Sequence, residues 1–425
     1  MRCRNIVLFL IAGGLLWAGP SPDPEAPYVP HELIVKLQPD ASPVAAGTAL
    51  TAGLGDRVTV LQVEPTLNYL VITFDPAVSL REAREDLLRD PAVRDVSYNY
   101  RARIHDTIPD DPYLHQQYAL NNSGQEFYAY PEDEESYRGT SGADIKAFSA
   151  WDWYTGSADT IIAILDTGIC AEHEDLEGKV VQGYNFIEDS FETSDDNGHG
   201  TFVASIAAAS THNGVGMAGV NWHAKLMPIK VADSDGYADY KSLALAIRYA
   251  ADNGADILNI SLGGPNPSFI LEDALENALA KNVIIVASSG NTATNVDYPA
   301  AYDKYCLAVG ASDENDRIAE YSNYGYSLDL VAPGDKVLGA FYDPRLPEIL
   351  DGYALGSGTS YAAPLVAGTA GLVKAYKPFL TNSEIILLIK YTADDINAEY
   401  FPGVDLYAGY GRLNLYQLIG PYPVE

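Results

Sequence analysis

The stretch Gly358-Thr359-Ser360-Tyr361-Ala362-Ala363-Pro364 leads from a glycine turn into a run of small and apolar residues. A proline is tolerated in the first turn of a helix, because its missing N–H would be unpaired there. The stretch therefore predicts a buried helix that begins at Ser360. Free backbone N–H groups at such a helix start stabilise a developing negative charge. A serine that only caps the helix fits the same pattern, so the chemistry depends on a base elsewhere in the chain.

Two other stretches supply an aspartate and a histidine at positions suited to activate Ser360. Residues 161–165 form a short apolar run, typical of a strand buried in a parallel sheet, and lead into Asp166-Thr167-Gly168. Open α/β sheets place their sites at the carboxyl ends of such strands. Asn197-Gly198-His199-Gly200-Thr201 then opens a second helical run. Asp166, His199 and Ser360 thus follow one of the chain orders known for a catalytic triad.

The alternation of apolar runs and amphipathic runs predicts an α/β domain with a parallel sheet covered on both faces. The predicted strands are residues 161–165, 226–231, 257–262, 283–287 and 307–311, and the predicted helices between them are residues 243–253 and 271–280.

From about Pro109 to Asn414 the chain resembles the subtilisin family of serine proteases, and within it the thermitase group. The motifs that carry the resemblance are Asp166-Thr167-Gly168, His199-Gly200-Thr201, Ser261-Leu262-Gly263, Gly290-Asn291 and Gly358-Thr359-Ser360. The resemblance implies a three-layer α/β subtilisin-like fold with a mainly parallel sheet. It also implies a serine endopeptidase that hydrolyses peptide bonds through an acyl-enzyme.

The resemblance assigns a role to each candidate catalytic residue. Ser360 is expected to attack the scissile carbonyl, His199 to act as the general base, and Asp166 to orient His199. Asn291 is expected to donate a side-chain N–H to the oxyanion. A plain turn residue after Gly290 is the alternative interpretation of Asn291.

A polypeptide substrate is expected to bind as an extended strand along an exposed strand edge. The resemblance places Ser261-Leu262-Gly263 on one side of this peptide and Gly236 in the loop opposite. It also places Asp297 near the floor of the pocket for the side chain that precedes the cut, where a carboxylate favours Lys or Arg. The simpler interpretation, which the pattern favours, is that Asp297 faces solvent or caps the turn before Pro299.

Calcium is the structural ion that the resemblance implies. Asp111, Asp175 and Asn213 match the side-chain ligands of the thermitase group, and backbone carbonyls of residues 210–217 would complete the site. Hard oxygen ligands of this kind suit Ca²⁺.

The chain is strongly acidic, with a formal net charge of −32 over 425 residues, and 47% of its residues are hydrophobic. The apolar content suffices for a folded core, and the acid excess argues against nucleic-acid partners and anionic membrane surfaces. The acidic residues of one loop are interpreted as a solvated charge run, with a second ion site as the alternative. They are Glu188, Asp189, Asp195 and Asp196.

The sequence predicts three parts. Residues 1–19 have two arginines before an apolar run that is shorter than the ~20 residues of a membrane span, as in a secretory signal. Residues 20–105 resemble the family's propeptide, a small α+β ferredoxin-like domain that serves as intramolecular chaperone and inhibitor. Residues 106–425 are the expected catalytic domain. We therefore expect a secreted monomer without a stable membrane anchor, matured by self-cleavage near His105.

Four positions depart from the family pattern without removing a catalytic group. Phe202 and Ser205 replace a common His and Gly after His-Gly-Thr, and Tyr361 replaces the usual Met after the nucleophile. Cys170 stands where a polar residue is common. Cys170 and Cys306 both lie in or beside apolar runs, which favours buried free thiols over a disulfide.

Two other classes of protein share single features with this chain. An aspartic protease pairs two Asp-Thr/Ser-Gly loops, and the sequence has no second loop of this kind beside Asp166-Thr167-Gly168. A catalytically inactive relative that serves as a binding protein would be expected to lack a residue of the triad. In this sequence all three residues are present. Peptide hydrolysis with and without a serine-directed inhibitor separates these classes from a serine endopeptidase.

Overall fold

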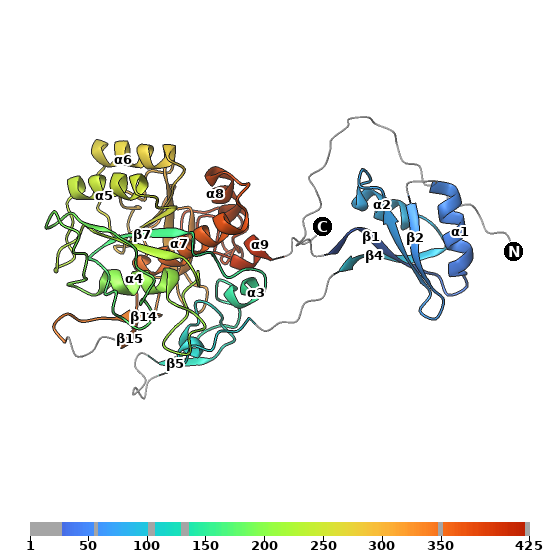
Figure 1. Cartoon of the computed structure of the whole chain (residues 1–425), viewed down its shortest axis with the longest axis horizontal. Helices are drawn as coiled ribbons and strands as arrows, with labels where there is room; N and C mark the ends of the chain where they lie inside the picture. The colour runs from blue at the N-terminus through green and yellow to red at the C-terminus, as the bar shows by residue number, and fades with distance from the viewer. Residues whose placement is uncertain (1–27, 55–57, 101–106, 129–135, 347–351, 421–425) are drawn as a thin grey trace. The chain divides into compact units, whose positions relative to one another are not determined.

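The computed structural model describes residues 28–54, 58–100, 107–128, 136–346 and 352–420. These residues divide into two compact units, with the boundary between His105 and Asp106. Figure 1 shows the chain from blue at the N-terminus to red at the C-terminus. The predicted signal, residues 1–19, and the predicted cleavage region near His105 lie outside the described residues.

The first unit is a four-stranded antiparallel sheet with two helices, in the strand order β2-β3-β1-β4. Its elements are β1 (Tyr28–Leu37), α1 (Pro43–Leu54), β2 (Val58–Glu64), β3 (Tyr69–Phe74), α2 (Leu80–Leu87) and β4 (Val93–Tyr100). This βαββαβ order and strand arrangement confirm the predicted ferredoxin-like α+β fold.

The core of this unit follows the alternation of its strands. Leu33, Val35 and Leu37 point to the buried face of β1, where they are at most 1% exposed, because successive strand side chains face opposite ways. Ser79 is the N-cap residue of α2, and its side chain accepts a hydrogen bond from Glu82 N. Helix α1 and strand β2 were not predicted.

The second unit contains a seven-stranded sheet in the order β13-β12-β11-β10-β7-β9-β8, with parallel pairing throughout. Its strands are β7 (Ile161–Asp166), β8 (Tyr184–Asn185), β9 (Lys225–Lys230), β10 (Ile257–Ile260), β11 (Ile284–Ser288), β12 (Cys306–Ser312) and β13 (Leu330–Pro333). All five predicted strands are present. The sequence did not predict β8, which has only two residues, or β13, which ends in a proline.

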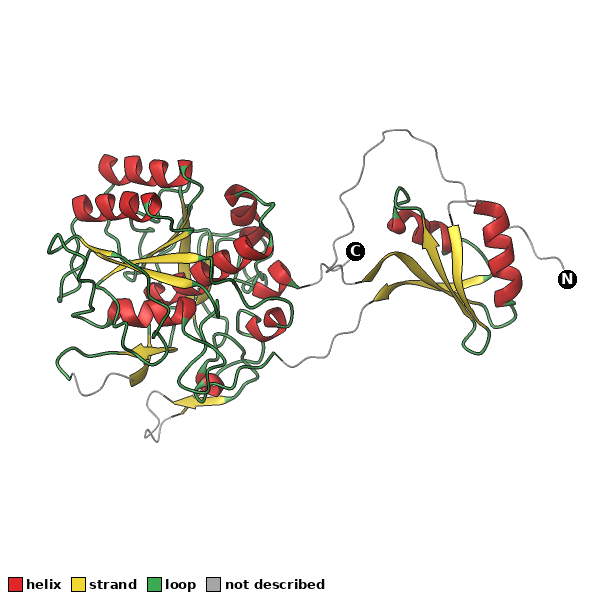
Figure 2. Cartoon of the chain, in the orientation of Figure 1, coloured by secondary structure: helices red, strands yellow, loops and turns green. Residues whose placement is uncertain are grey.

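Helices cover both faces of this sheet, which confirms the predicted three-layer α/β fold (Figure 2). Alternate residues of β7 divide between two cores: Ile162 and Ile164 pack with one set of helices, and Ala163 and Leu165 with the other. The first set is α3 (Ala147–Trp151), α4 (His199–Ala208), α7 (Thr359–Tyr376), α8 (Asn382–Tyr391) and α9 (Leu415–Ile419). The second set is α5 (Tyr240–Asp252) and α6 (Phe269–Ala280).

Smaller elements lie outside the sheet. Strands β14 (Val337–Phe341) and β15 (Gly352–Gly356) pair antiparallel, as do β5 (Glu126–Tyr128) and β6 (Ser136–Arg138), and η2 (Leu114–Gln116) is a short 3₁₀ helix. No helix among the described residues is long and apolar enough to cross a membrane.

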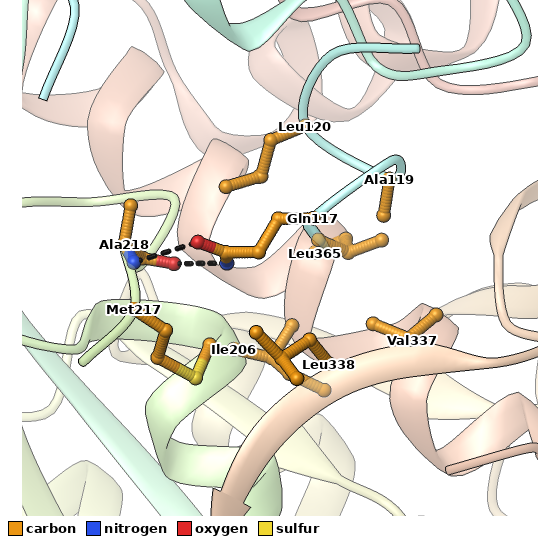
Figure 3. Close-up of a pocket in the computed structure, with 9 residues that line it drawn as sticks. All are labelled: Gln117, Ala119, Leu120, Ile206, Met217, Ala218, Val337, Leu338 and Leu365. Atoms are coloured by element: carbon orange, nitrogen blue, oxygen red, sulfur yellow. Dashed lines mark hydrogen bonds between the residues drawn. The ribbon is translucent and has the colours of Figure 1, made fainter. Parts of the chain in front are cut away.

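A small cavity of about 10 Å³ lies between the segment after η2, helices α4 and α7 and strand β14 (Figure 3). Gln117 contributes its only side-chain amide, which donates to Ala218 O at 2.7 Å and accepts from Ala218 N at 2.8 Å. Because the amide is satisfied and the space holds about one water, this cavity is a packing feature and not a ligand site.

Lys179 is a buried cation in the second unit. It is 6% exposed, and its Nζ donates to Trp222 O at 2.7 Å. Across the described ranges no carboxylate forms an ion pair with it. Burial, with a smaller contribution from the charge of Lys225, lowers the pKa of Lys179 to about 7.

Lys179→Met should stabilise the protein at low pH. The unfolded pKa is roughly 10.4, so between pH ~7 and ~10 the unfolded chain binds the extra proton, and the stability of the wild type rises with pH. We expect the variant to gain about 2 kcal/mol in free energy of unfolding at pH 6 and nothing at pH 10, measured by urea unfolding. The exposed Lys241→Met is the control, and equal differences for both variants at both pH values would contradict the prediction.

Candidate active site

Asp166 and His199 meet at the carboxyl end of β7. Asp166 is the last residue of this strand, and His199 is the first residue of α4. His199 Nδ1 lies 2.7 Å from Asp166 Oδ1, with the Asp166 side chain 2% exposed and the His199 side chain 28% exposed. Gly198 reverses the chain before the helix with φ 107°, a conformation that glycine adopts without strain. The buried carboxylate thus holds a partly exposed imidazole.

The electrostatics of His199 follow from this contact. Burial acts to lower its pKa, but the charge of Asp166, the hydrogen bond to Asp166 and the charge of Asp195 together raise it above its ordinary value. A histidine whose protonated form is stabilised in this way is suited to accept a proton at near-neutral pH.

Asp195 connects the strand end to the helix. Its Oδ1 accepts hydrogen bonds from Thr167 Oγ1 and from the backbone N–H groups of residues 197 and 198, at 2.8 to 3.0 Å. Its Oδ2 accepts from the N–H and the hydroxyl of Thr201, at 2.9 and 2.6 Å. Asp195 is 2% exposed, so its interpretation as part of a solvated charge run is wrong.

The other acidic residues of that loop are exposed. Asp196 pairs with the buried Lys230 at 2.5 Å, and Glu188 and Asp189 face solvent. The signal for Asp195 was available in the sequence, since an Asp placed shortly before a helix start is a common capping residue.

Ser360 is the second residue of α7, and Pro364 is the sixth, so the proline lies beyond the first turn where the sequence predicted it. The carbonyl of Ser360, four residues before the proline, accepts from Ser261 Oγ instead of from a backbone N–H. The Ser360 hydroxyl donates to Ser261 O at 3.0 Å, and Ser261 Oγ donates to Ser360 O at 2.9 Å. The Ser360 proton is therefore directed to Ser261 and not to His199 in this structure. Hydrogen bonds between catalytic groups are often formed only when substrate is bound.

Asn291 follows β11 and is clamped to the start of α7. Its Oδ1 accepts from the N–H and the hydroxyl of Thr359, at 2.8 and 2.9 Å, while Thr359 Oγ1 also accepts from Gly290 N at 3.2 Å. The Asn291 side chain is exposed. Because its oxygen is held by two donors, its Nδ2 is left as the outward-facing donor.

Asp297 lies against the backbone of two of the sequence motifs. A Cβ on Gly290 would be 2.4 Å from Asp297 Oδ2, and a Cβ on Gly263 would be 3.5 Å from Asp297 Cβ. Within the described part of the chain the carboxylate makes no hydrogen bond, so it does not cap the turn before Pro299. Burial raises its pKa. Asp297 thus lies beside Gly263 and Gly290, and its role in a substrate pocket remains a prediction.

Leu262 and Gly263 follow Ser261 at the end of β10, and Gly263 packs closely on the chain before Pro299, because a Cβ there would lie 2.6 Å from Tyr298 O. Gly236 belongs to the loop between β9 and α5. It occupies an exposed turn with φ 81°, and no atom lies within 4 Å of the position that a Cβ would take.

The three expected metal ligands are neighbours. Asn213 Nδ2 donates to Asp175 Oδ1 at 3.1 Å, and the N–H of His212 donates to Asp111 Oδ2 at 2.9 Å. Asp175 and Asp111 are 0% and 4% exposed, and Asp111 Oδ1 is buried without a partner. Burial raises the pKa of both carboxyls, that of Asp175 to about 6. The described residues contain no group of three or more His, Cys, Asp or Glu side chains placed so that they could hold a metal ion.

Comparison with known proteins agrees with this geometry. The sequence model of the Subtilase family matches residues 157–411. The chain is 37% identical to "Thermophilic serine proteinase" of Bacillus sp. (strain AK1) over 313 residues, which cover 71% of this chain and 74% of that protein. It is 38% identical to "Thermitase" of Thermoactinomyces vulgaris over 276 residues, 65% of this chain and 93% of that protein.

Solved structures show the same likeness. A protease from Pseudoalteromonas arctica superposes with a TM-score of 0.61 at 27% identity, covering 73% of this chain and 98% of its own. Sphericase superposes with a TM-score of 0.57 at 31% identity, covering 62% and 93%. The chain therefore belongs to the subtilase family and is a subtilisin-like serine endopeptidase that acts on polypeptides.

Proposed function

We propose that Asp166, His199 and Ser360 form the catalytic triad of this endopeptidase and that Asn291 completes its oxyanion hole. The observation that carries the proposal is the 2.7 Å contact between the buried Asp166 and the partly exposed His199. The start of α7 lies beside this pair, because the ring of Tyr361, the residue after Ser360, is 5.7 Å from the His199 ring.

In the proposed mechanism the Ser360 hydroxyl turns from Ser261 O to His199 and attacks the scissile carbonyl carbon. His199 takes the hydroxyl proton, and Asp166 stabilises the imidazolium that results. The carbonyl oxygen becomes an oxyanion, which accepts hydrogen bonds from Asn291 Nδ2 and from the Ser360 N–H. His199 then gives its proton to the leaving amine. Water hydrolyses the remaining acyl-enzyme by the same route.

We also propose that residues 1–19 direct secretion and that residues 20–105 are a propeptide that assists folding and inhibits the enzyme until it is cut. The ferredoxin-like fold of the first unit supports this proposal. The same active site is expected to make the cut.

Ser360→Ala should leave the purified precursor uncut between residues ~98 and 112, because the nucleophile is missing. Mass spectrometry of the N-terminus reports the processing. Ser357→Ala, three residues earlier in an exposed position, is the matched control and should mature normally. A Ser360→Ala precursor that matures in isolation would refute self-cleavage by this serine.

We also propose that the protein binds a structural calcium ion. Asp111 and Asp175 would hold it through carboxylate oxygens, and the two buried carboxylates have no basic side chain bonded to them within the described residues. Asn213 would have to turn its amide, because its Nδ2 donates to Asp175 and its Oδ1 accepts from Val215 N in this structure. The unpartnered Asp111 Oδ1 fits a cation. Tyr353 and Met217 N donate to Asp175 Oδ2 at 2.8 Å, so only part of its coordination capacity is free. The ion's contribution would be structural, since it would tie the start of the second unit, at Asp111, to residues 210–217.

Calcium should raise the free energy of unfolding by about 2.7 kcal/mol at a hundredfold excess over its dissociation constant. The thermal midpoint of the protein should rise accordingly. Asp175→Ala and Asp111→Asn should lose most of this increase. Glu188→Ala removes one exposed charge and should keep it. Identical midpoints in calcium and in chelator would rule out the site.

Asp297 is proposed to select Lys or Arg at the position before the cut, since its carboxylate lies beside Gly290 without a hydrogen-bond partner among the described residues. Asp297→Asn should lower the ratio of kcat/KM for Arg over Phe substrates about tenfold, or ~1.4 kcal/mol. Asp303→Asn, a nearby exposed carboxylate, should leave the ratio unchanged. A change below about threefold in Asp297→Asn would mean that the pocket is simply apolar.

A further inference from the structure

Two aromatic side chains form a continuous row of tilted ring contacts that ends on His199. The ring of Tyr361 lies 5.7 Å from the imidazole at an interplanar angle of 43°, and the ring of Phe202 lies 4.5 Å from that of Tyr361 at 44°. Both distances are typical of favourable aromatic contacts. Phe202 and Tyr361 are also two of the positions at which the chain departs from the family pattern, and the structure shows that these two departures touch each other.

The β14–β15 hairpin is shaped to receive this aromatic pair. A Cβ on Gly339 would lie 2.2 Å from the Phe202 ring, and a Cβ on Gly356 would lie 2.7 Å from the Tyr361 ring and 3.0 Å from Phe202 Cζ. Gly339 lies in β14 and Gly356 in the neighbouring β15. Neither glycine has a positive φ, so the backbone does not require them. The space that the two rings occupy is the reason these positions lack side chains.

A third departure fastens the hairpin to the helix at the same place. Ser205 Oγ donates to Phe202 O at 2.7 Å and accepts from Ala340 N at 2.9 Å. Ser205 and Phe202 are 0% and 6% exposed. Helix α4, which begins with His199, is therefore joined to β14 by a buried hydroxyl and by ring packing.

We propose that Tyr361 and Phe202 are positioning residues for His199, which hold the imidazole between Asp166 and Ser360. This inference rests on the proposed function of the triad. A single hydrogen bond at Nδ1 leaves the imidazole free to tilt about that contact, and a ring packed beside it removes much of this freedom. Because the position of a proton acceptor strongly affects the rate, these ring contacts should act on kcat more than on KM.

Tyr361 acts through its ring and not through its hydroxyl. Its hydroxyl makes no hydrogen bond with any described residue, and burial together with the charge of Asp166 raises the pKa of Tyr361 to about 12. The phenol is therefore neutral when the enzyme works. The titratable groups that face His199 are Asp166 from β7, Asp195 from the loop before α4 and Tyr361 from α7. Loss of the Tyr361 ring should admit water and raise the pKa of His199.

The experiment compares Tyr361→Ala, Tyr361→Phe, Phe202→Leu and the double variant Tyr361→Ala/Phe202→Leu. Tyr361→Ala should lower kcat at least about tenfold with KM changed less than about threefold, and should shift the acidic limb of kcat/KM upward by about half a pH unit. Tyr361→Phe keeps the ring and should recover most of the loss. The double variant should be little worse than Tyr361→Ala, because the two rings act as one unit.

Tyr249→Ala is the matched control. It removes a ring from the Tyr184–Tyr249 pair, whose centroids are 5.2 Å apart at 33°, far along the chain from the triad motifs. It should lower the thermal midpoint without moving the acidic limb. If Tyr361→Ala behaves in the same way, with kcat and the acidic limb unchanged, the positioning role is refuted.

A second measurement separates this inference from the proposed function. The titration of His199 followed by NMR in Ser360→Ala and in Ser360→Ala/Tyr361→Ala needs no turnover, and the pKa should rise by about half a unit when the ring is removed. An unchanged titration would overturn the positioning role even if the wild type is active. Hydrolysis that survives Ser360→Ala would overturn the proposed triad, whatever the titration shows.

Discussion

The buried carboxylate of Asp195 is the constraint on which the candidate site depends. An ionised carboxylate that is 2% exposed is tolerated only if donors surround it. Its five hydrogen bonds come from Thr167, which follows Asp166, from residues 197 and 198 before His199, and from Thr201 in the first turn of α4. A shift of the helix away from the strand end would leave this charge unsatisfied. The 2.7 Å contact between Asp166 and His199 is thereby fixed by a neighbour that takes no part in it.

Close backbone packing does the rest of the positioning. A Cβ on Gly200 would lie 2.1 Å from Gly168 O, and a Cβ on Gly368 would lie 2.6 Å from Ala207 O. Helix α4 therefore approaches the loop after β7, and α7 approaches α4, more closely than larger residues permit. His199 is the first residue of α4 and Ser360 the second residue of α7, so this approach brings the proposed base and the proposed nucleophile to the same edge of the sheet. The helix starts also present their N–H groups there.

The sequence predicted the parts of this site that are local in the chain, because apolar runs such as residues 161–165 mark strands and each motif residue follows a strand or opens a helix. The contacts that hold the site join distant residues. The ring contact between Tyr361 and Phe202 is one of these. In the sequence, the two glycines that make room for the rings look like ordinary turn formers. The role of Asp195 was missed because a run of acidic residues is usually solvated. For Asp297, the sequence does not distinguish a pocket residue from a turn cap. The structure shows its carboxylate beside Gly290, with no cap hydrogen bond in the described chain.

The proposed nucleophile, Ser360, is also coupled to the strand that is expected to bind substrate. Ser360 and Ser261 exchange two hydrogen bonds, and Asn259 Nδ2 orients the Ser261 hydroxyl at 2.9 Å. The start of α7 is thus tied to the end of β10, where the substrate backbone is expected to pair. In the proposed mechanism the Ser360 hydroxyl has one proton and two acceptors, the Ser261 carbonyl and His199. Rotation about the Cβ–Oγ bond of Ser360 moves the hydroxyl proton from one acceptor to the other. The contact with Ser261 therefore keeps the serine in place without preventing transfer of its proton to His199.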